Sequence, residues 1–401
     1  MGGSIAAIVP TFNRAHFLRE SLRALLAQTR PLAEIIVWDD GSTDGTAETV
    51  AALEGPIRYF RQDNAGKSRA LNAAMDHVSA DYIWICDDDD LSRPDAAERL
   101  AAALDRADAG VAAGSYLQFW LDETTGARTE APPGYWPDLS SGSVLRHLLE
   151  DIFLFQNATM VRRDAYALVG PFREDLPRSI DYDMILRLAA RYPVALIDGV
   201  LFEQRKHSGA RGPLNARHAA DQSETVWLQT DQAVLAGLRP LLPLSLYEAM
   251  FDTDEPALAA RAALMQRAGV YARRDDWAPA LEDFSAAAEI DAGPMTPLEW
   301  RICRRAMEGK HGVGAGMQSA RRRQAGALRS AGPVGRDIAA ALARGIRWRA
   351  RRALQKRDLP GAASVLRYAL ATGGLTPGAP PAAGHDRIAE RDRLPTEAYR
   401  W

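Results

Sequence analysis

The sequence predicts an α/β fold with a doubly wound, mostly parallel sheet over the first half, followed by an all-α C-terminal region. Two observations carry this prediction. Short apolar segments alternate with amphipathic helical segments over the first half, and from about Ala219 the pattern is rich in Ala, Leu and Arg without strand signals. Strands that alternate with helices in this way pair in parallel through right-handed crossovers. The chain of 401 residues, 47% of them hydrophobic, is long enough for two or three domains.

The expected elements follow one another closely in the first half. We expect strands at Ile5–Val9, Glu34–Trp38, Ile57–Phe60, Tyr82–Cys86, Gly110–Phe119 and Gln156–Arg163, and a strand pair within Val194–Phe202. We expect helices at Ala15–Gln28 and Thr46–Leu53, one ending near His77, one opened by Leu91–Pro94 and one beginning within Ser179–Arg187. The uniformly apolar first strand is typical of a strand that is buried on both faces.

Polar clusters follow four of these strands. They are Pro10–Arg14, Asp39–Asp40, Asn64–Arg69 and Asp87–Asp90. A single cluster is typical of a turn. In doubly wound sheets, however, ligands bind beyond the carboxyl ends of the strands, so four clusters at the same edge indicate a binding site.

The four consecutive acids Asp87–Asp90 are the strongest chemical feature of the sequence. Their mutual repulsion at the end of a buried strand is destabilising unless a cation lies among them, and carboxylate oxygens suit Mg²⁺ or Mn²⁺. The alternative is a solvated acidic turn. Asp39 and Asp40 can accept hydrogen bonds from a nucleobase or a ribose, while Lys67 and Arg69 bring positive charge suited to a pyrophosphate. Together these features describe a nucleotide-diphosphate site with a bridging metal.

Several function classes are disfavoured. No Gly-x-Gly-x-x-Gly turn follows the first strand and no Gly-Lys-Ser/Thr phosphate loop is present, which argues against a dinucleotide oxidoreductase and an ATPase. The net charge of −3 gives no reason to expect nucleic acid as a partner. Two cysteines are too few for a disulfide framework, and neither a signal peptide nor a bilayer-spanning segment is recognisable. We therefore expect a cytoplasmic protein, or one peripheral at the inner face of the membrane.

The motifs resemble those of family 2 glycosyltransferases of the GT-A fold. The resemblance covers roughly residues 4 to 210 and rests on Val9–Arg14, Asp39–Thr46, Asn64-x-Gly66 with Asn72, and Asp87-x-Asp89-Asp90 with Pro94. It implies that Asp87 and Asp89 are the family's DxD acids and that Asp89 binds Mn²⁺ or Mg²⁺ directly. The residues expected at the donor nucleotide are Pro10, Thr11, Arg14, Asp39, Asp40, Lys67, Arg69, Asp87 and Asp88.

The resemblance also implies a catalytic base. An inverting sugar transfer needs a carboxylate near the acceptor hydroxyl, and Asp181 matches the Asp of the family's Glu-Asp pair, with Ile180 where the Glu usually stands. Asp183 is the fallback, and the alternative role for Asp181 is that of a helix cap. Some relatives place a metal-contacting or pyrophosphate-contacting His at the position of His207, which is otherwise an ordinary polar residue.

The second half is expected to be a helical domain over residues 219–372, followed by a flexible tail over 373–401 that is rich in Gly and Pro at its start; the catalytic domain would span 1–218. Asp276–Ala288 resembles the second helix of a tetratricopeptide repeat, and Asp358–Leu370 echoes it, although an Ala-rich helical bundle explains both. Residues 301–357 are strongly basic. Such a surface can rest on an anionic membrane, attract an anionic acceptor, or simply be solvated.

The sequence therefore predicts an inverting, metal-dependent glycosyltransferase that moves a sugar from a nucleotide-diphosphate sugar donor to an acceptor hydroxyl. We expect a glycan or lipid-linked acceptor in surface glycan or polysaccharide biosynthesis, and peripheral membrane contact through the basic helices. Two alternatives remain at this point. A nucleotidyltransferase shares the sheet and the metal acids, and a catalytically silent GT-A scaffold would act through its helical half.

Overall fold

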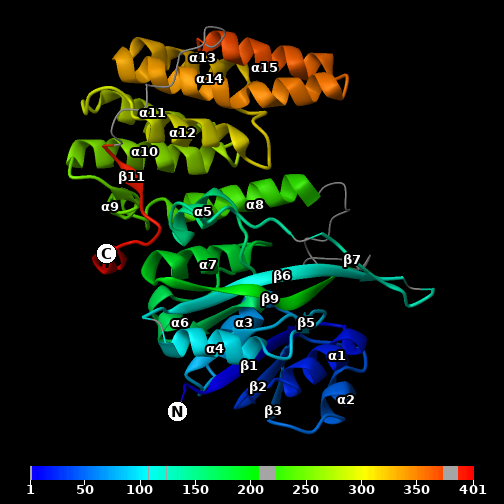
Figure 1. The fold of residues 1–401 in the computed structure, drawn as a ribbon. Helices are drawn as coiled ribbons and strands as arrows, with labels where there is room; N and C mark the ends of the chain where they lie inside the picture. The colour runs from blue at the N-terminus through cyan, green and yellow to red at the C-terminus, as the bar shows by residue number, and fades with distance from the viewer. Residues whose placement is uncertain (1, 107, 123, 133, 207–222, 374–386) are drawn as a thin grey trace. The chain divides into compact units, whose positions relative to one another are not determined.

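The computed structural model describes residues 2–106, 108–122, 124–132, 134–206, 223–373 and 387–401 (Figure 1). The chain forms two compact units. The first unit comprises residues 1–138 and 152–223, and the second comprises residues 139–151 and 224–401. Each unit is described by itself below.

The first unit is built on a mixed sheet of nine strands among the described residues, in the order β3-β2-β1-β4-β8-β6-β9-β5, with β7 paired to β6. The strands are β1 (Ile5–Thr11), β2 (Glu34–Asp39), β3 (Ile57–Arg61), β4 (Tyr82–Ile85), β5 (Leu91–Ser92), β6 (Val111–Leu121), β7 (Arg128–Glu130), β8 (Thr159–Arg162) and β9 (Val194–Lys206). Strands β1 to β4 are parallel, as the alternating pattern predicts. Strand β8 runs antiparallel between β4 and β6, and β9 returns parallel to β6.

Helices cover this sheet because each carries one apolar stripe. The helices of the first unit are α1 (Ala15–Leu26), α2 (Thr46–Ala51), α3 (Lys67–Met75), α4 (Ala96–Arg106), α6 (Arg163–Val169) and α7 (Ile180–Arg191). Helix α1 buries Leu18, Leu22 and Leu25, which recur every three to four residues. All seven residues of β1 are buried, as the uniformly apolar sequence predicts for a strand covered on both faces.

Two local expectations differ from the structure. The segment expected to open a helix instead forms β5, because Leu91–Ser92 pairs with the end of β9 and helix α4 begins only at Ala96. The expected strand pair at Val194–Phe202 is one continuous strand. Its turn-like Gly199, with φ of +88°, lies where the pairing of β9 with β6 shifts register, so the irregularity is a bulge and not a hairpin.

The second unit is helical. Its helices are α5 (Val144–Glu150), α8 (Ser223–Leu238), α9 (Leu244–Glu248), α10 (Pro256–Ala272), α11 (Trp277–Glu289), α12 (Pro297–Arg305), α13 (Ser319–Ala327), α14 (Gly332–Gln355) and α15 (Leu359–Ala371). The two segments that echo each other in sequence are α11 and α15, and each packs on the helix before it. Among the residues that the structure describes, no helix is both long and apolar enough to cross a membrane.

Two features of the second unit were not predicted from the sequence. Residues 139–151 belong to it, although they precede residue 218. Residues 387–401 do not form an extended tail: β11 (Ala389–Glu390) pairs antiparallel with β10 (Phe251–Asp252), and Ile388 is buried. The Gly- and Pro-rich composition that suggested a flexible tail ends at Gly384, before this ordered segment begins.

Glu150, at the end of α5, is the centre of a buried ion-pair network in the second unit. Its carboxylate lies 3.2 Å from Arg146 and 3.2 Å from Arg305, and it accepts a hydrogen bond of 2.9 Å from the Gln266 amide. Burial alone would raise the pKa of Glu150, but the charges of Arg305, Arg146 and Arg273 outweigh it and lower the pKa to about 2.

This network predicts a pH dependence of stability. Because the folded-state pKa of Glu150 lies below the unfolded value of about 4.3, its stabilisation is present above pH 4.3 and is lost as the pH falls toward 2. We expect the difference in unfolding free energy between wild type and Glu150→Gln to shrink by about 3 kcal/mol at most between pH 6 and pH 2, measured by urea denaturation. The exposed Glu289→Gln is the control, and a difference that does not change with pH would contradict the prediction.

Candidate active site

The carboxyl ends of β1, β2 and β4 meet at one edge of the sheet. The register of the parallel pairs places Thr11 beside Asp39 and Ile8 beside Ile85, so that the residues after each strand converge. The four polar clusters expected at this edge are therefore neighbours in the structure.

The four consecutive acids divide into two alternating pairs. Asp88 is buried and accepts hydrogen bonds from the Thr11 hydroxyl at 2.7 Å and from Arg14 at 3.0 Å. Asp90 is also buried and accepts from the Asn157 amide at 2.7 Å and from the backbone N–H of Arg205 at 2.9 Å. These two carboxylates anchor the loop after β4.

The other two acids of the run are more open to solvent. The side chains of Asp87 and Asp89 are 33% and 15% exposed. Asp87 forms an ion pair with Lys67, and Asp89 lies 2.9 Å from Arg14. The alternation thus leaves the carboxylates of Asp87 and Asp89 partly exposed, while the buried Asp88 and Asp90 fix the loop to the rest of the unit.

The electrostatics of this loop favour a bound cation. Burial and the charge of Asp89 raise the pKa of Asp88 to about 6, even though Arg14 opposes the shift. Burial and the charges of Asp89 and Asp87 raise the pKa of Asp90 well above its ordinary value. Asp87, Asp89 and Asp90 can each offer one carboxylate oxygen such that these oxygens lie within 4.8 Å of one another. This all-oxygen donor set fits Mg²⁺ or Mn²⁺, whose charge would relieve the repulsion.

Lys67 links the acidic loop to Asp181. Burial would lower the pKa of Lys67, but the charges of Asp87, Asp181 and Asp89 raise it, so the amine is a cation among these three acids. Burial in turn raises the pKa of Asp181, and the charge of Lys67 opposes that shift. The structure therefore brings Asp181 to the same edge as the acids of β4, although the two segments are nearly a hundred residues apart in sequence.

The two acids in the first turn of α7 have different surroundings. Asp183 is 1% exposed and forms ion pairs with Arg187 at 2.8 Å and Arg173 at 3.6 Å. Asp181 is partly buried, and one of its carboxylate oxygens accepts a 2.9 Å hydrogen bond from the backbone N–H of Tyr182. Asp183 therefore holds α7 through its ion pairs, whereas the carboxylate of Asp181 keeps more hydrogen-bond acceptor capacity.

Asp39 and Asp40, at the end of β2, are both buried. Their carboxylates differ in how many hydrogen-bond acceptor sites are already used within the protein. One oxygen of Asp40 accepts from the Gln62 amide and the Ala65 backbone N–H, and the other accepts from the Asn64 amide and the Gly66 backbone N–H. These four bonds fill the roughly four acceptor sites of a carboxylate.

Asp39 accepts from the Ser42 backbone N–H at 2.7 Å and from the Tyr59 hydroxyl, so acceptor capacity remains. Asp40 therefore holds the loop between β3 and α3, and Asp39 is the member of the pair with room for a ligand hydrogen bond.

This role of Asp40 predicts a stability effect. Asp40→Ala removes a buried carboxylate and leaves two partly buried backbone N–H groups and two side-chain amides without their acceptor. We expect a loss of about 3 kcal/mol in the free energy of unfolding, measured by urea denaturation. The exposed Asp63→Ala, in the same loop region, is the matched control and should change stability by less than about 0.5 kcal/mol. Equal stability of the two variants would contradict the loop-holding role.

The remaining predicted site residues lie in different settings. Pro10 is buried within β1, where it pairs in register with Trp38. The exposed Arg69 forms an ion pair of 2.7 Å with Glu174. His207 lies outside the described residues.

Three residues that brace the site were assigned no individual role from the sequence, although Asp90 belongs to the acidic motif. Asp90, Asn157 and Arg205 brace the acidic loop, and Arg205 also pairs with Glu20 at 2.6 Å. Asp90 was visible as the fourth acid of the run. The other two carry no local motif, because they reach the loop from β9 and from the turn before β8 through long-range pairing of the sheet.

Comparison with known proteins places part of the chain among sequences of one family. Residues 6–168, about two-fifths of the chain, match the model of glycosyl transferase family 2. An uncharacterised glycosyltransferase of Rickettsia conorii is 29% identical over 233 residues, covering 56% of this chain and 37% of that protein. A chondroitin synthase of Pasteurella multocida is 28% identical over 200 residues, covering 46% of this chain and 19% of the synthase. The chain thus spans well under half the length of these two relatives.

Solved structures share the fold. The structure of residues 1–349 of S. aureus TarS in complex with UDP-GlcNAc matches with a TM-score of 0.51 at 12% sequence identity, covering 88% of this chain and 92% of that one. The same segment of TarS without the donor gives a TM-score of 0.50 at 13% identity. At such low identity the match describes the fold.

Proposed function

We infer that this chain, which matches the model of glycosyl transferase family 2 over residues 6–168, transfers a sugar from a nucleotide-diphosphate donor to an acceptor hydroxyl with inversion at the anomeric carbon. The single observation that carries the proposal is the convergence of Asp39, the Asp87–Lys67 pair, Asp89 and Asp181 at one edge of the sheet. The fold match to a protein crystallised with UDP-GlcNAc supports a nucleotide-sugar donor.

We assign the donor to the edge formed by β1, β2 and β4. Asp39 would accept from the nucleoside, with Thr11 and Arg14 positioned beside it through their contacts with Asp88. Asp40 would act indirectly by holding the loop that carries Lys67. Lys67, kept cationic by the acids around it, would face the diphosphate. Arg69, which pairs with Glu174, is the member of the predicted set with the least support.

Asp87, Asp89 and Asp90 would hold a divalent cation, with Asp89 as the principal ligand of the DxD pair. Bound there, Mg²⁺ or Mn²⁺ would neutralise negative charge on the leaving diphosphate. In this structure Arg14 forms ion pairs with Asp88 and Asp89. If Asp89 bound a cation, the guanidinium of Arg14 would be free to donate hydrogen bonds to the donor phosphates.

Asp181 would accept the proton of the acceptor hydroxyl as that oxygen attacks the anomeric carbon. Its raised pKa suits a base that must take up a proton, and the positive charge of Lys67 favours the ionised form of the carboxylate. The bond from the anomeric carbon to the diphosphate oxygen breaks as the new glycosidic bond forms. One displacement of this kind inverts the configuration and needs no covalent intermediate.

The acceptor is proposed to be a glycan or a lipid-linked glycan, and the similarity to a chondroitin synthase supports a role in polysaccharide or surface glycan formation. A membrane-bound acceptor would bring the basic helices α13 and α14 close to an anionic surface, where peripheral contact is favourable.

The proposal is tested by incubating the purified protein with Mn²⁺ and a panel of sugar nucleotides, and measuring release of the nucleoside diphosphate. With an α-linked donor, NMR of the first sugar formed by hydrolysis should show the β anomer. Release of the α anomer would contradict inversion, and the absence of release from every donor would contradict sugar transfer as a whole.

A further inference from the structure

Helix α15 carries a second apolar face in addition to the one that packs. Its packed face buries Ala362, Val365, Tyr368 and Ala369. Leu359, Leu366 and Leu370 are spaced by seven and four residues, which places them together on another side of the helix. Their exposed fractions are 67%, 45% and 54%. The solvated face of a helix is ordinarily polar, so three aligned and exposed leucines indicate a contact surface.

The turn between α14 and α15 adds a fourth leucine to this surface. Arg357 has a φ of +59°, and the backbone N–H of Asp358 donates to the carbonyl of Ala353 at 2.9 Å, which closes a tight turn at the end of α14. Leu354, which is 54% exposed, therefore lies at the same end of the helix pair as Leu359. Helix α15 then packs along α14 (Figure 1). We refer to Leu354, Leu359, Leu366 and Leu370 as the leucine surface.

Basic side chains accompany the leucine surface. Residues 351–370 contain five Lys and Arg residues and a single acid, in a chain whose net charge is −3. That acid, Asp358, caps α15, because its carboxylate accepts a 2.9 Å hydrogen bond from the backbone N–H of Gly361. The five basic residues are all exposed: Arg351, Arg352, Lys356, Arg357 and Arg367. The end of α14 and the length of α15 are thus apolar and cationic at once.

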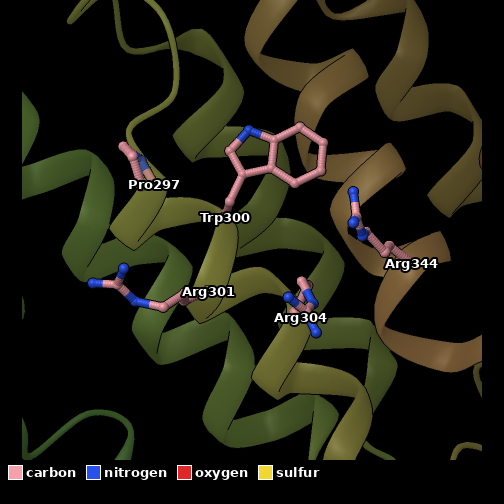
Figure 2. Close-up of a pocket in the computed structure, with 5 residues that line it drawn as sticks. All are labelled: Pro297, Trp300, Arg301, Arg304 and Arg344. Atoms are coloured by element: carbon pink, nitrogen blue, oxygen red, sulfur yellow. The ribbon is translucent and has the colours of Figure 1, made fainter. Parts of the chain in front are cut away.

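The leucine surface is distinct from the pocket that α14 helps to form. That pocket has a volume of about 170 Å³ and is lined by Pro297, Trp300, Arg301, Arg304 and Arg344, from α12 and α14 (Figure 2). None of the four leucines belongs to this lining. They project from an exposed helix face, whereas a partner helix is typically held in a groove. An exposed face that is both apolar and cationic suits the interface of an anionic bilayer.

We propose that the leucine surface binds an anionic lipid bilayer, with the leucines inserted among the headgroups and the five basic side chains against the lipid phosphates. Leucine side chains gain free energy when their apolar area leaves water, and Lys and Arg reach anionic headgroups on long apolar stems. A second copy of the chain fits less well, because it would bring the same five cations against one another.

This assignment deepens the proposed peripheral contact and rests on the proposed function for its biological meaning, which is access to a lipid-linked acceptor. The charge of α13 and α14 supports attraction to a membrane, and the leucine surface adds the place where the protein inserts. The binding test needs neither donor, metal nor acceptor, so its result does not depend on sugar transfer.

The test is co-sedimentation of the full chain with vesicles of mixed phosphatidylglycerol and phosphatidylcholine, and with vesicles of phosphatidylcholine alone. At physiological ionic strength we expect the protein to bind the mixed vesicles, and to bind pure phosphatidylcholine at least about tenfold more weakly. The first result reports anionic lipid, and the second shows how much of the affinity comes from charge.

A pair of leucine variants tests insertion. Leu359→Gln with Leu366→Gln should weaken binding to the mixed vesicles by at least about tenfold, because amides replace side chains that would leave water. The control, Leu168→Gln with Leu241→Gln, changes two exposed leucines outside the leucine surface and should keep the affinity within about twofold. All four positions are exposed, so both double variants should unfold at the temperature of the wild type.

A pair of charge variants tests the contribution of the basic side chains. Arg351→Gln with Lys356→Gln should weaken binding to the mixed vesicles by about tenfold. The control, Arg393→Gln with Arg400→Gln, removes the same charge from exposed positions near the end of the chain and should keep the affinity within about twofold.

Four outcomes overturn the assignment. Wild-type affinity in the Leu359→Gln, Leu366→Gln variant would mean electrostatic attraction without insertion. Equal loss in a test pair and its control would mean that binding is not local to this surface. Dimers of the wild type that the same leucine variant abolishes, without binding to vesicles, would assign the surface to a second copy. Binding of soluble polyglutamate, without binding to vesicles, would assign it to an acidic polypeptide.

The assignment and the proposed function fail separately. Absence of donor hydrolysis in the wild type would contradict sugar transfer and leave the vesicle result intact. Absence of vesicle binding, with donor hydrolysis at full rate, would contradict the membrane assignment alone.

Discussion

Asp181→Asn is expected to lower the turnover number by about 10²- to 10⁴-fold while the affinity for the donor nucleotide stays within about twofold. The substitution keeps the shape of the side chain and an oxygen that can accept the Tyr182 backbone hydrogen bond, but removes the ability to take up a proton. Loss of a group that acts as general base lowers kcat by this range. The measurement is steady-state kinetics of nucleoside diphosphate release together with nucleotide binding by calorimetry.

Two neighbouring acids serve as controls for this prediction. Asp175→Asn removes a charge from an exposed side chain that pairs with Arg173, and should leave kcat unchanged. Asp183→Asn disrupts the buried ion pair with Arg187 and should lower stability as well as activity. If Asp181→Asn keeps wild-type turnover, Asp181 is a helix-terminal residue and not the base.

The second large effect is expected at the metal site. Asp89→Asn removes one charge from the proposed principal ligand of the cation, and we expect at least about a hundredfold loss of Mn²⁺-dependent donor turnover. The Mn²⁺ concentration for half-maximal activity should rise in parallel. Arg14 keeps its contact with Asp88 in this variant, so the fold of the loop should be preserved.

Asp95→Asn is the matched control, because Asp95 lies six residues further along, is half-exposed and pairs only weakly with Arg99. It should keep wild-type metal dependence. If Asp89→Asn retains full activity at the same Mn²⁺ concentration, then either the cation binds at another position or the reaction does not need it.

Periodicity and motif spacing were sufficient to predict the parallel half of the sheet. Strands β1 to β4 and the helices between them are defined by local apolar patterns. Because ligands bind beyond the carboxyl ends of such strands, the sequence also predicted that the four polar clusters lie at the same edge of the sheet. The later strands were harder to predict from the sequence. Leu91–Ser92 is too short to show a pattern, and it becomes a strand only because β9 provides an edge for it.

The division of labour within the site could not be predicted in the same way. Four adjacent aspartates are equivalent in sequence, and only the fold decides that Asp88 and Asp90 point inward while Asp87 and Asp89 remain open. Likewise, Asp40 resembles a ligand-binding residue by motif, and its four internal hydrogen bonds become evident only once the loop after β3 is in place.

The central claim is that this edge of the sheet is a metal-dependent nucleotide-diphosphate site. The most direct test is the thermal stability of the protein with UDP, GDP, CDP or TDP, each with and without Mn²⁺. We expect one base to stabilise the fold in the presence of Mn²⁺, by about 2.7 kcal/mol at a hundredfold excess over its dissociation constant, with the effect lost in Asp89→Asn. Stabilisation by none of the four nucleotides, or stabilisation that is the same without Mn²⁺ and in Asp89→Asn, would contradict the claim.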